Sequence, residues 1–326
     1  MNVPLDAWLH LVQDEYLREY LPGGGSAVKF LVGQAPETLG EVDRRLARLA
    51  LEEGFEFARV DSARIKIHMI DQLFHEVARQ LRWVDLARNY VVELLTADGF
   101  RIPAEADRFS FEGIAAVNNF GQAQLRGRLR DLLWKQVFRD PAMAQEFALA
   151  MMHLCQALLE DPADGTEVMG TISAWLQGEL RLVSALKRYQ IYQKIGRHNA
   201  RHMFLSMAHW LRRTGAKGLV LVLDIGAYTA SSRPLEAGGG LYHTPAAAMD
   251  AYEVLRQFID ETDQLESCFA AVLAPQAFLT DEKRGLSKYD ALRLRVWDEV
   301  HDRQRENPLS SLVRIEGLAS ALEGAA

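Results

Sequence analysis

The apolar and polar positions of the N-terminal third predict a strand–helix–strand unit. Residues 5–21 carry apolar side chains at helical spacing, and the glycines after Pro22 end that helix. Residues 27–33 are a short run rich in β-formers, residues 39–53 have one apolar helix face, and residues 55–60 alternate as a second strand. A strand, a helix and a second strand within a few tens of residues indicate a parallel sheet.

The remaining pattern predicts a long helical stretch followed by more strands of the same sheet. From residue 64 to about 215 the spacing is almost entirely helical, with breaks near 99–103, 140–141 and 161–165. Buried strands are then predicted at 218–224 and 269–275, helices at 246–262 and 288–304, and a mobile glycine-rich loop at 226–246.

The predicted fold is therefore α/β, with a parallel sheet core of the P-loop NTPase type and a large helical insertion. We place the core in residues 1–98 and 190–326 and the insertion in residues 99–189.

Composition narrows the protein class. Apolar residues make up 49% and charged residues 25% of 326 residues, which is typical of a globular protein with a core. A formal charge of -7 argues against wholesale wrapping of nucleic acid. Cys155 and Cys268 lie among apolar residues and are expected to be buried thiols. With neither a signal peptide nor an apolar run near the ~20 residues of a membrane span, we expect a cytoplasmic protein.

The first strand and its loop resemble a phosphate-binding site that has lost key groups. In a P-loop, backbone N–H groups and a lysine hold the phosphates, while a Ser/Thr hydroxyl and a strand-end aspartate hold Mg²⁺. If the loop is 33–40, only Gly33 matches: Thr38 stands for the second glycine, Leu39 for the lysine and Gly40 for the hydroxyl residue. A loop at 23–30 would supply Lys29, but it precedes the strand, so we favour the first alignment.

The second half of the site shows a comparable loss. Asp224 ends the strand at 218–224, but Ile225 follows it where a water-activating glutamate is common. We therefore expect a degenerate nucleotide pocket built from Gly33, Thr38 and Asp224, without catalysis, without a metal site and without ATP or Mg²⁺ as a required cofactor. An ordinary turn that never bound phosphate is the alternative.

Long sequence segments resemble a known family. They are IGRHNARHMFLSMAHWLRRTGAKGLVLVLDI, DAYEVLRQFIDETDQLES, APQAFLTDEKRGLSKYDALRLRVWDEVHDR and NPLSSLVRI, with GGGSAVKFLVG and ALEEGFEFARVDS nearer the N-terminus. The chain resembles the ATP-binding proteins of BREX-type anti-phage defence systems, the BrxD-like P-loop proteins, most strongly from Ile195 to Arg314. The resemblance implies an ATPase fold, whereas the departures at 34–40 and at Asp224-Ile225 imply a pseudo-ATPase.

A basic stretch and several smaller groups are further candidates. Residues 180–223 contain no Asp or Glu, and their cations are candidates for contact with DNA or a partner: Arg181, Arg188, Lys194, Arg197 and Arg201. Arg293 and Arg295 are candidates for acting in trans on a neighbour's nucleotide, with ion pairs to Asp290, Asp298 or Glu299 as the favoured alternative.

Other patterns favour ordinary structural roles. His198 and His202 are four residues apart but lack a third ligand, so packing or hydrogen bonding is favoured. The six tryptophans stand at helical core spacings and form no evident stacking platform. An acidic helix face is expected to be solvated or to receive a basic partner, and it consists of Asp250, Glu253, Asp260, Glu261, Asp263 and Glu266.

The sequence thus predicts a non-catalytic scaffold or regulatory subunit of a BREX-like defence complex. Its expected partners are other defence-system subunits, such as an active P-loop paralogue or a helicase, with DNA as a further candidate and no membrane. Two alternatives stay open. One is a working ATPase that uses Lys29 or a partner's lysine, and the other is a DNA-binding module built on residues 180–217.

Overall fold

The computed structural model describes most of the 326-residue chain and divides it into two units. A sheet unit consists of residues 1–77 and 216–326, and a helical unit consists of residues 78–215. The described residues are 2–105, 108–231, 240–297 and 307–316.

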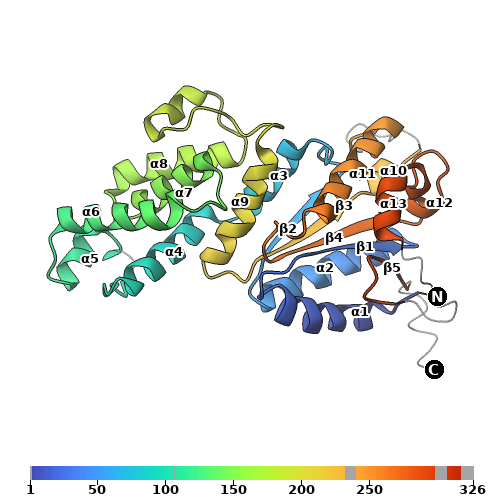
Figure 1. The fold of residues 1–326 in the computed structure, drawn as a ribbon, viewed down its shortest axis with the longest axis horizontal. Coiled ribbons are helices and arrows are strands. Elements are labelled where there is room, and N and C mark those ends of the chain that lie inside the picture. Colours follow the sequence, from blue (N-terminus) through green and yellow to red (C-terminus); the bar gives the residue numbers. More distant parts are fainter. Residues whose placement is uncertain (1, 106–107, 232–239, 298–306, 317–326) are drawn as a thin grey trace. The chain divides into compact units, whose positions relative to one another are not determined.

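The sheet unit is built on five parallel strands in the order β2-β3-β4-β1-β5 (Figure 1). Strands β1, β3 and β4 are apolar on both faces and almost wholly buried, as expected of strands covered by helices on both sides. Their bounds are β1 Ala27–Gly33, β2 Glu56–Asp61, β3 Leu219–Asp224, β4 Cys268–Pro275 and β5 Leu312–Ile315.

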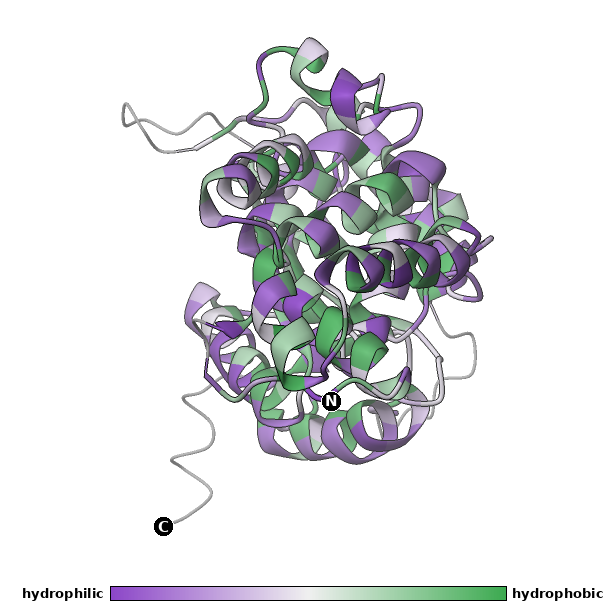
Figure 2. Cartoon of the chain, turned by 90° about the vertical axis from the view of Figure 1, so that its left-hand side faces the viewer, coloured by the Kyte–Doolittle hydropathy of each residue, from purple (hydrophilic) through white to green (hydrophobic). Residues whose placement is uncertain are grey.

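One face of the sheet is covered by the N-terminal helices. In this layer Trp8 and Leu46 pack with Leu31 and Phe269 of the sheet, and the Trp8 and Phe269 ring centroids are 6.4 Å apart. The layer is amphipathic, because its buried apolar residues pack against the sheet. Figure 2 shows that apolar and polar residues are interspersed along the helices of the chain. It consists of α1 Leu5–Leu11, the π-helical η1 Val12–Tyr20 and α2 Pro36–Glu52.

The C-terminal helices cover the opposite face. Phe30 of β1 stacks on Phe278 at 5.8 Å between ring centroids, and Tyr252 meets Phe278 edge-on at 5.5 Å. This layer follows β3 and β4 in the chain and consists of α10 Gly226–Thr229, α11 Pro245–Asp260, α12 Ala277–Thr280, η5 Leu286–Lys288 and α13 Asp290–Val296.

The helical unit has a core of its own. Tyr90 of α4 packs on Trp210 of α9 at 4.6 Å between ring centroids, and Trp83 meets Phe147 of α7 at 6.1 Å. Helix α3, Ile70–Gln80, leads from the sheet unit into these helices. They are α4 Trp83–Ala97, α5 Phe111–Val117, α6 Gln122–Leu133, η3 Trp134–Phe138, α7 Gln145–Ala157, α8 Pro162–Leu176, η4 Val183–Tyr189 and α9 Ala200–Arg213.

The predicted α/β class with a parallel sheet and a helical insertion is confirmed, with differences in detail. The contacts divide the chain after residues 77 and 215, whereas the sequence placed the boundaries after 98 and 189, because α4 and α9 bury their apolar faces within the helical unit. Helix α2 begins at Pro36 rather than at 39. Strand β5 was not predicted, because it is only four residues long.

Some predictions fall on parts of the chain outside the described residues. They concern the glycine-rich loop at 232–239, the end of the last predicted helix at 298–306 and the C-terminal residues 317–326. Within the described part of the same predicted loop, residues 226–229 form the short helix α10.

Candidate nucleotide site

The nucleotide pocket predicted from the sequence falls at the carboxyl-terminal edge of the parallel sheet, where β1 and its neighbour β4 end. In open parallel sheets, ligands bind where the connections of neighbouring strands leave toward opposite faces. Strand β1 leads into α2 on one face, and its neighbour β4 leads into α12 on the other (Figure 1). Gly33, the last residue of β1, lies at this edge in register with Pro275 of β4 and Ile315 of β5.

The Leu39 side chain closes the connection after Gly33. Only Gln34 and Ala35 separate β1 from the helix that begins at Pro36. A Cβ added to Gly33 would lie 2.8 Å from Cγ and Cδ2 of Leu39. Leu39 itself is 8% exposed and belongs to the core between α2 and the sheet. The position aligned with the phosphate-binding lysine therefore holds an apolar side chain that packs onto the loop.

The backbone donors of this turn are few. Pro36 lacks an N–H group, and the N–H groups of Thr38 and Leu39 both point to the Ala35 carbonyl at 3.2 and 3.5 Å. Thr38 is 1% exposed, so its hydroxyl is not presented to solvent. A phosphate loop depends on several consecutive free N–H groups around the anion. In the described turn, Pro36, Thr38 and Leu39 do not supply such groups.

The carboxylate of Asp224, at the end of β3, forms an ion pair with Arg59. The Nη2 atom of Arg59 lies 3.2 Å from Oδ2 of Asp224, its Nε lies 2.7 Å from Asp43, and its Nη1 lies 3.6 Å from Asp61. The N–H of Gly226 donates to Oδ1 of Asp224 at 3.0 Å. Burial raises the pKa of Asp224 above its ordinary value, and burial likewise raises the pKa of Asp43.

Sequence reasoning missed Arg59. The signal was weak but present, because Arg59 and Asp61 alternate on β2, and a neighbouring parallel strand ends in Asp224 at the same level. The register pairs Val222 with Arg59 and Asp224 with Asp61. Such a pairing cannot be read before the strand order is known.

Gly33, Thr38 and Asp224 lie along one sheet edge but are not joined. Asp224 aligns with Leu273 of β4, which aligns with Leu31 of β1, so the aspartate is two strands and roughly 10 Å away from β1. Within the described part of the chain, no hydrogen bond or ion pair connects Asp224 with Thr38. The predicted residues therefore share an edge of the sheet without forming a described cluster.

Lys29 lies toward the opposite end of β1. Four residues of strand separate it from Gly33, which is roughly 13 Å. The side chain is 6% exposed, and Nζ donates to the carbonyls of Leu309 at 2.5 Å and Ser310 at 3.3 Å. Nζ also lies 5.0 Å from the centre of the Tyr16 ring. Lys29 thus holds the segment that enters β5, and burial lowers the pKa of Lys29 to about 8.

Lys29 gives an expected pH dependence of stability. Between pH 8 and about 10.4 the unfolded chain keeps a proton that folded Lys29 has lost, so stability rises with pH over this interval. The rise is at most about 3 kcal/mol, because each pH unit between the folded and unfolded pKa contributes about 1.4 kcal/mol. Urea unfolding at pH 7, 9 and 10 measures it, and Lys29→Met is expected to remove this part of the rise. Equal pH profiles for the two proteins would contradict it.

The histidines and cysteines of the described residues form neither a metal-ligand cluster nor an exposed thiol. These contain no group of three or more His, Cys, Asp or Glu side chains arranged to hold a metal. His198 precedes α9 rather than sharing it with His202, and its Nε2 lies 3.1 Å from Oε1 of Gln193. Cys155 and Cys268 are buried free cysteines, as predicted, and burial raises the pKa of both thiols.

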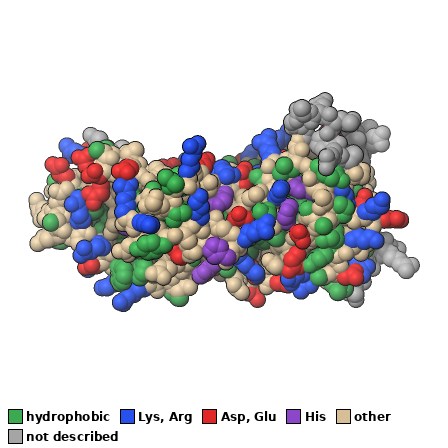
Figure 3. All heavy atoms as spheres, turned by 90° about the horizontal axis from the view of Figure 1, so that it is seen from above, with side chains coloured by type: hydrophobic (Ala, Val, Ile, Leu, Met, Phe, Trp, Pro, Cys, Tyr) green, Lys and Arg blue, Asp and Glu red, His purple; other side chains and the backbone are tan. Residues whose placement is uncertain are grey.

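The cations of residues 181–201 do not form one uniform surface. Arg188 pairs with Glu167 at 2.6 Å, and Lys194 donates to the Arg181 carbonyl at 3.1 Å. Arg197 and Arg201 are exposed. On the face drawn in Figure 3, Lys and Arg side chains alternate with Asp and Glu side chains. Contact of this stretch with DNA or a partner stays a prediction.

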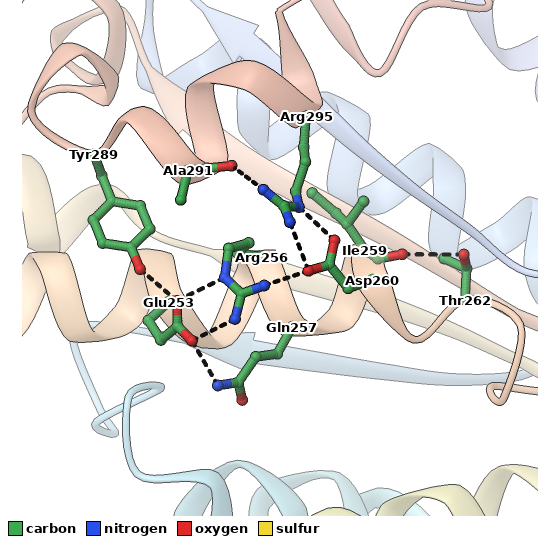
Figure 4. Close-up of polar contacts among 9 residues, drawn as sticks. All are labelled: Glu253, Arg256, Gln257, Ile259, Asp260, Thr262, Tyr289, Ala291 and Arg295. Atoms are coloured by element: carbon green, nitrogen blue, oxygen red, sulfur yellow. Dashed lines mark hydrogen bonds and ion pairs between the residues drawn. The ribbon is translucent and has the colours of Figure 1, made fainter.

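The acidic helix α11 is largely neutralised within the sheet unit (Figure 4). Arg256 lies between Glu253 and Asp260, bonding Glu253 at 2.6 Å, and Tyr289 donates to the same glutamate. The Arg256 bond lowers the pKa of Glu253 to about 2. Arg295 pairs with Asp260, with Nη2 and Oδ2 2.9 Å apart, and the Arg295 hydrogen bond lowers the pKa of Asp260.

The two candidate trans-acting arginines are thus both engaged within the chain. Arg293 pairs with Asp290 at 2.9 Å, which is one of the ion pairs expected from the sequence. The partner of Arg295 is Asp260, which the sequence analysis did not consider. An action of either arginine on a neighbouring subunit stays a prediction.

A comparison with protein-family models identifies the relatives of the chain. Residues 121–322, more than half of the chain, match the model of the BREX system ATP-binding protein BrxC/D. The chain belongs to this family. The match includes residues 195–314, where the resemblance is strongest, and extends back to residue 121. It leaves out the N-terminal segments that the sequence analysis also found similar.

Further comparisons add no relative to the BrxC/D match. No curated protein and no solved structure matches the chain. Among the described helices of this BrxC/D-family protein, none is sufficiently long and apolar to span a bilayer.

Proposed function

We propose that this BrxC/D-family protein is a non-catalytic subunit of a BREX defence system, a pseudo-ATPase with a scaffold or regulatory role. The observation that carries the proposal is the closed β1–α2 connection, where Leu39 packs onto Gly33 and the helix begins at Pro36. A triphosphate needs a lysine, which Leu39 replaces here, and several free N–H groups, of which Pro36, Thr38 and Leu39 supply none. The residues at this edge therefore do not fit a magnesium-bound triphosphate.

Arg59 supports the same proposal from the other side of the edge. A strand-end aspartate in an active P-loop protein helps to hold Mg²⁺. Here the guanidinium of Arg59 neutralises Asp224, and Asp43 and Asp61 share that cation. Ile225, which is fully buried, offers no carboxylate to polarise a water molecule.

The partners we propose are other subunits of the defence system, including an active P-loop relative or a helicase. A subunit without turnover of its own acts through the proteins it binds. Purification of the tagged chain from cells that express the whole system, followed by identification of bound subunits, tests this part. Recovery of the tagged chain alone would contradict the scaffold role.

Calorimetric titration with MgATP and a phosphate-release assay test the nucleotide site. We expect no saturable binding at micromolar nucleotide and no turnover above that of buffer. Micromolar binding with turnover that Lys29→Ala abolishes would overturn the proposal in favour of a working ATPase. Lys288→Ala, which changes an exposed lysine on η5, is the matched control. Binding of MgATP without turnover would contradict the expected absence of nucleotide binding and would leave the non-catalytic role in place.

A further inference from the structure

An aromatic pair is exposed on the helical unit at the end of α6. The last turn there, η3, is π-helical. π-Helical turns are rare in proteins, and many of those that occur lie at functional sites. Trp134 of this turn is 43% exposed and stacks on Phe138, with ring centroids 4.1 Å apart and planes 19° apart. The sequence analysis expected Trp134 at a core position, and this expectation is wrong. Single exposed apolar side chains are common, as with Trp297 at 40%, so it is the stacking of Trp134 on a second ring that distinguishes this position.

Three cations surround this pair without partners of their own. Arg130, Lys135 and Arg139 are exposed, and none has a side-chain hydrogen bond or ion pair with another described residue. Other arginines of the same helix are paired, since Arg126 binds Glu160 at 2.5 Å and Arg128 binds Asp98. The unpaired cations are therefore gathered at one end of α6.

The helix geometry places Arg130 and Arg139 in one row with Trp134. Arg130 precedes Trp134 by four residues, so the two side chains lie on one helix face. The N–H of Arg139 donates to the Trp134 carbonyl at 3.1 Å, which places Arg139 one π-turn further along the same row. We call Arg130, Trp134, Lys135, Phe138 and Arg139 the Trp134 platform.

The carboxylates near the Trp134 platform act on other cations. Asp140 bonds His209 at 2.9 Å and also pairs with Arg213. The hydrogen bond from Arg128 to Asp98 is the main cause that raises the pKa of Arg128, and the charge of Asp131 adds a smaller contribution. The platform therefore combines a stacked ring pair with unbalanced positive charge.

We propose that the Trp134 platform binds single-stranded nucleic acid. A base stacks on the Trp134 ring and the neighbouring phosphates contact Arg130, Lys135 and Arg139, the combination by which proteins bind single strands without sequence preference. An acidic protein surface would satisfy the cations but leave the ring pair unused. This proposal does not depend on nucleotide binding at the sheet.

Fluorescence anisotropy with a labelled 20-nucleotide oligothymidine and the full chain tests the proposal. Wild type is expected to bind at low salt, with affinity that falls as salt rises. Trp134→Ala is expected to weaken binding about tenfold, because stacking contributes roughly 1–3 kcal/mol per base, and Trp134→Phe is expected to keep most of the affinity. The double variant Lys135→Glu/Arg139→Glu is expected to lose affinity and to flatten the salt dependence.

Matched variants separate the platform from general effects. Trp297→Ala removes a tryptophan of similar exposure, 40%, and Lys288→Glu reverses a charge elsewhere; both are expected to bind like wild type. Equal oligothymidine affinity of Trp134→Ala and wild type would overturn the proposal. So would competition by polyglutamate that displaces the oligothymidine equally well from wild type and from Trp134→Ala. Circular dichroism shows that each variant is folded.

Discussion

Replacing Gly218 by alanine is expected to destabilise the sheet unit by at least about 3 kcal/mol. Gly218 has a φ of +143°, a conformation that side chains rarely adopt, and an added Cβ would lie 2.0 Å from the Ser267 carbonyl oxygen. Backbone strain and overpacking each cost about 1–3 kcal/mol, and here they act together.

The backbone around Gly218 cannot easily yield. The Ser267 carbonyl accepts the N–H of Leu219 at 2.9 Å, and the Gly218 carbonyl accepts the N–H of Glu56 at 3.0 Å. Ser267 is fully buried, and its hydroxyl donates to the Leu21 carbonyl at 2.7 Å. Any shift that relieves the clash therefore disturbs the register of β3 with both of its neighbours.

Gly40→Ala is the matched control for Gly218→Ala. Gly40 lies within α2, and an added Cβ would meet nothing within 4 Å. Alanine is favoured over glycine by about 1 kcal/mol in a helix interior, so this variant is expected to be more stable than wild type. Urea unfolding of the two variants measures both effects. A loss below about 1 kcal/mol for Gly218→Ala would show that the close approach to Ser267 does not constrain the sheet.

The central strands could be predicted because their residues are apolar at successive positions, which indicates burial on both faces. Leu219–Leu223 and Phe269–Ala274 are apolar at every position, which only a strand covered on both faces requires. Strand β5 could not be predicted from its own residues, since it is only four residues long. It pairs with β1, and Lys29 of β1 donates hydrogen bonds to the carbonyls of Leu309 and Ser310 just before it. Such a long-range contact has no local signature.

The candidate site was predictable in position but not in its contacts. Gly33 ends a strand before a helix, so the sequence alone located the loop, and the replacement of the lysine by Leu39 was visible there. That Leu39 folds back onto Gly33, and that Arg59 reaches Asp224 from a neighbouring strand, follow from the strand order. The exposure of Trp134 likewise depends on where α6 ends, because apolar spacing is the same on a core face and on an exposed one.

Arg59→Met is expected to destabilise the protein by about 2 kcal/mol at pH 7. Removing the shared cation leaves three carboxylates close together, two at the ends of β2 and β3 and one within α2. Loss of one partner of a well-buried ion pair costs about 3–5 kcal/mol, and the partial exposure of these groups reduces that figure. The methionine keeps most of the apolar stem of the side chain, so the change isolates the charge.

The pH dependence of Arg59→Met distinguishes lost charge from lost packing. Burial already raises the pKa of Asp43 and Asp224, and removal of Arg59 raises both further above their unfolded values. A folded state that binds more protons than the unfolded state gains stability as pH falls, so the variant is expected to approach wild type between pH 7 and pH 5. Asp224→Asn in the Arg59→Met background is expected to restore part of the stability at pH 7, because the amide oxygen can still accept the Gly226 N–H. A deficit that is the same at pH 5 and pH 7, with no rescue by Asp224→Asn, would show that Arg59 acts through packing and does not neutralise this strand-end aspartate.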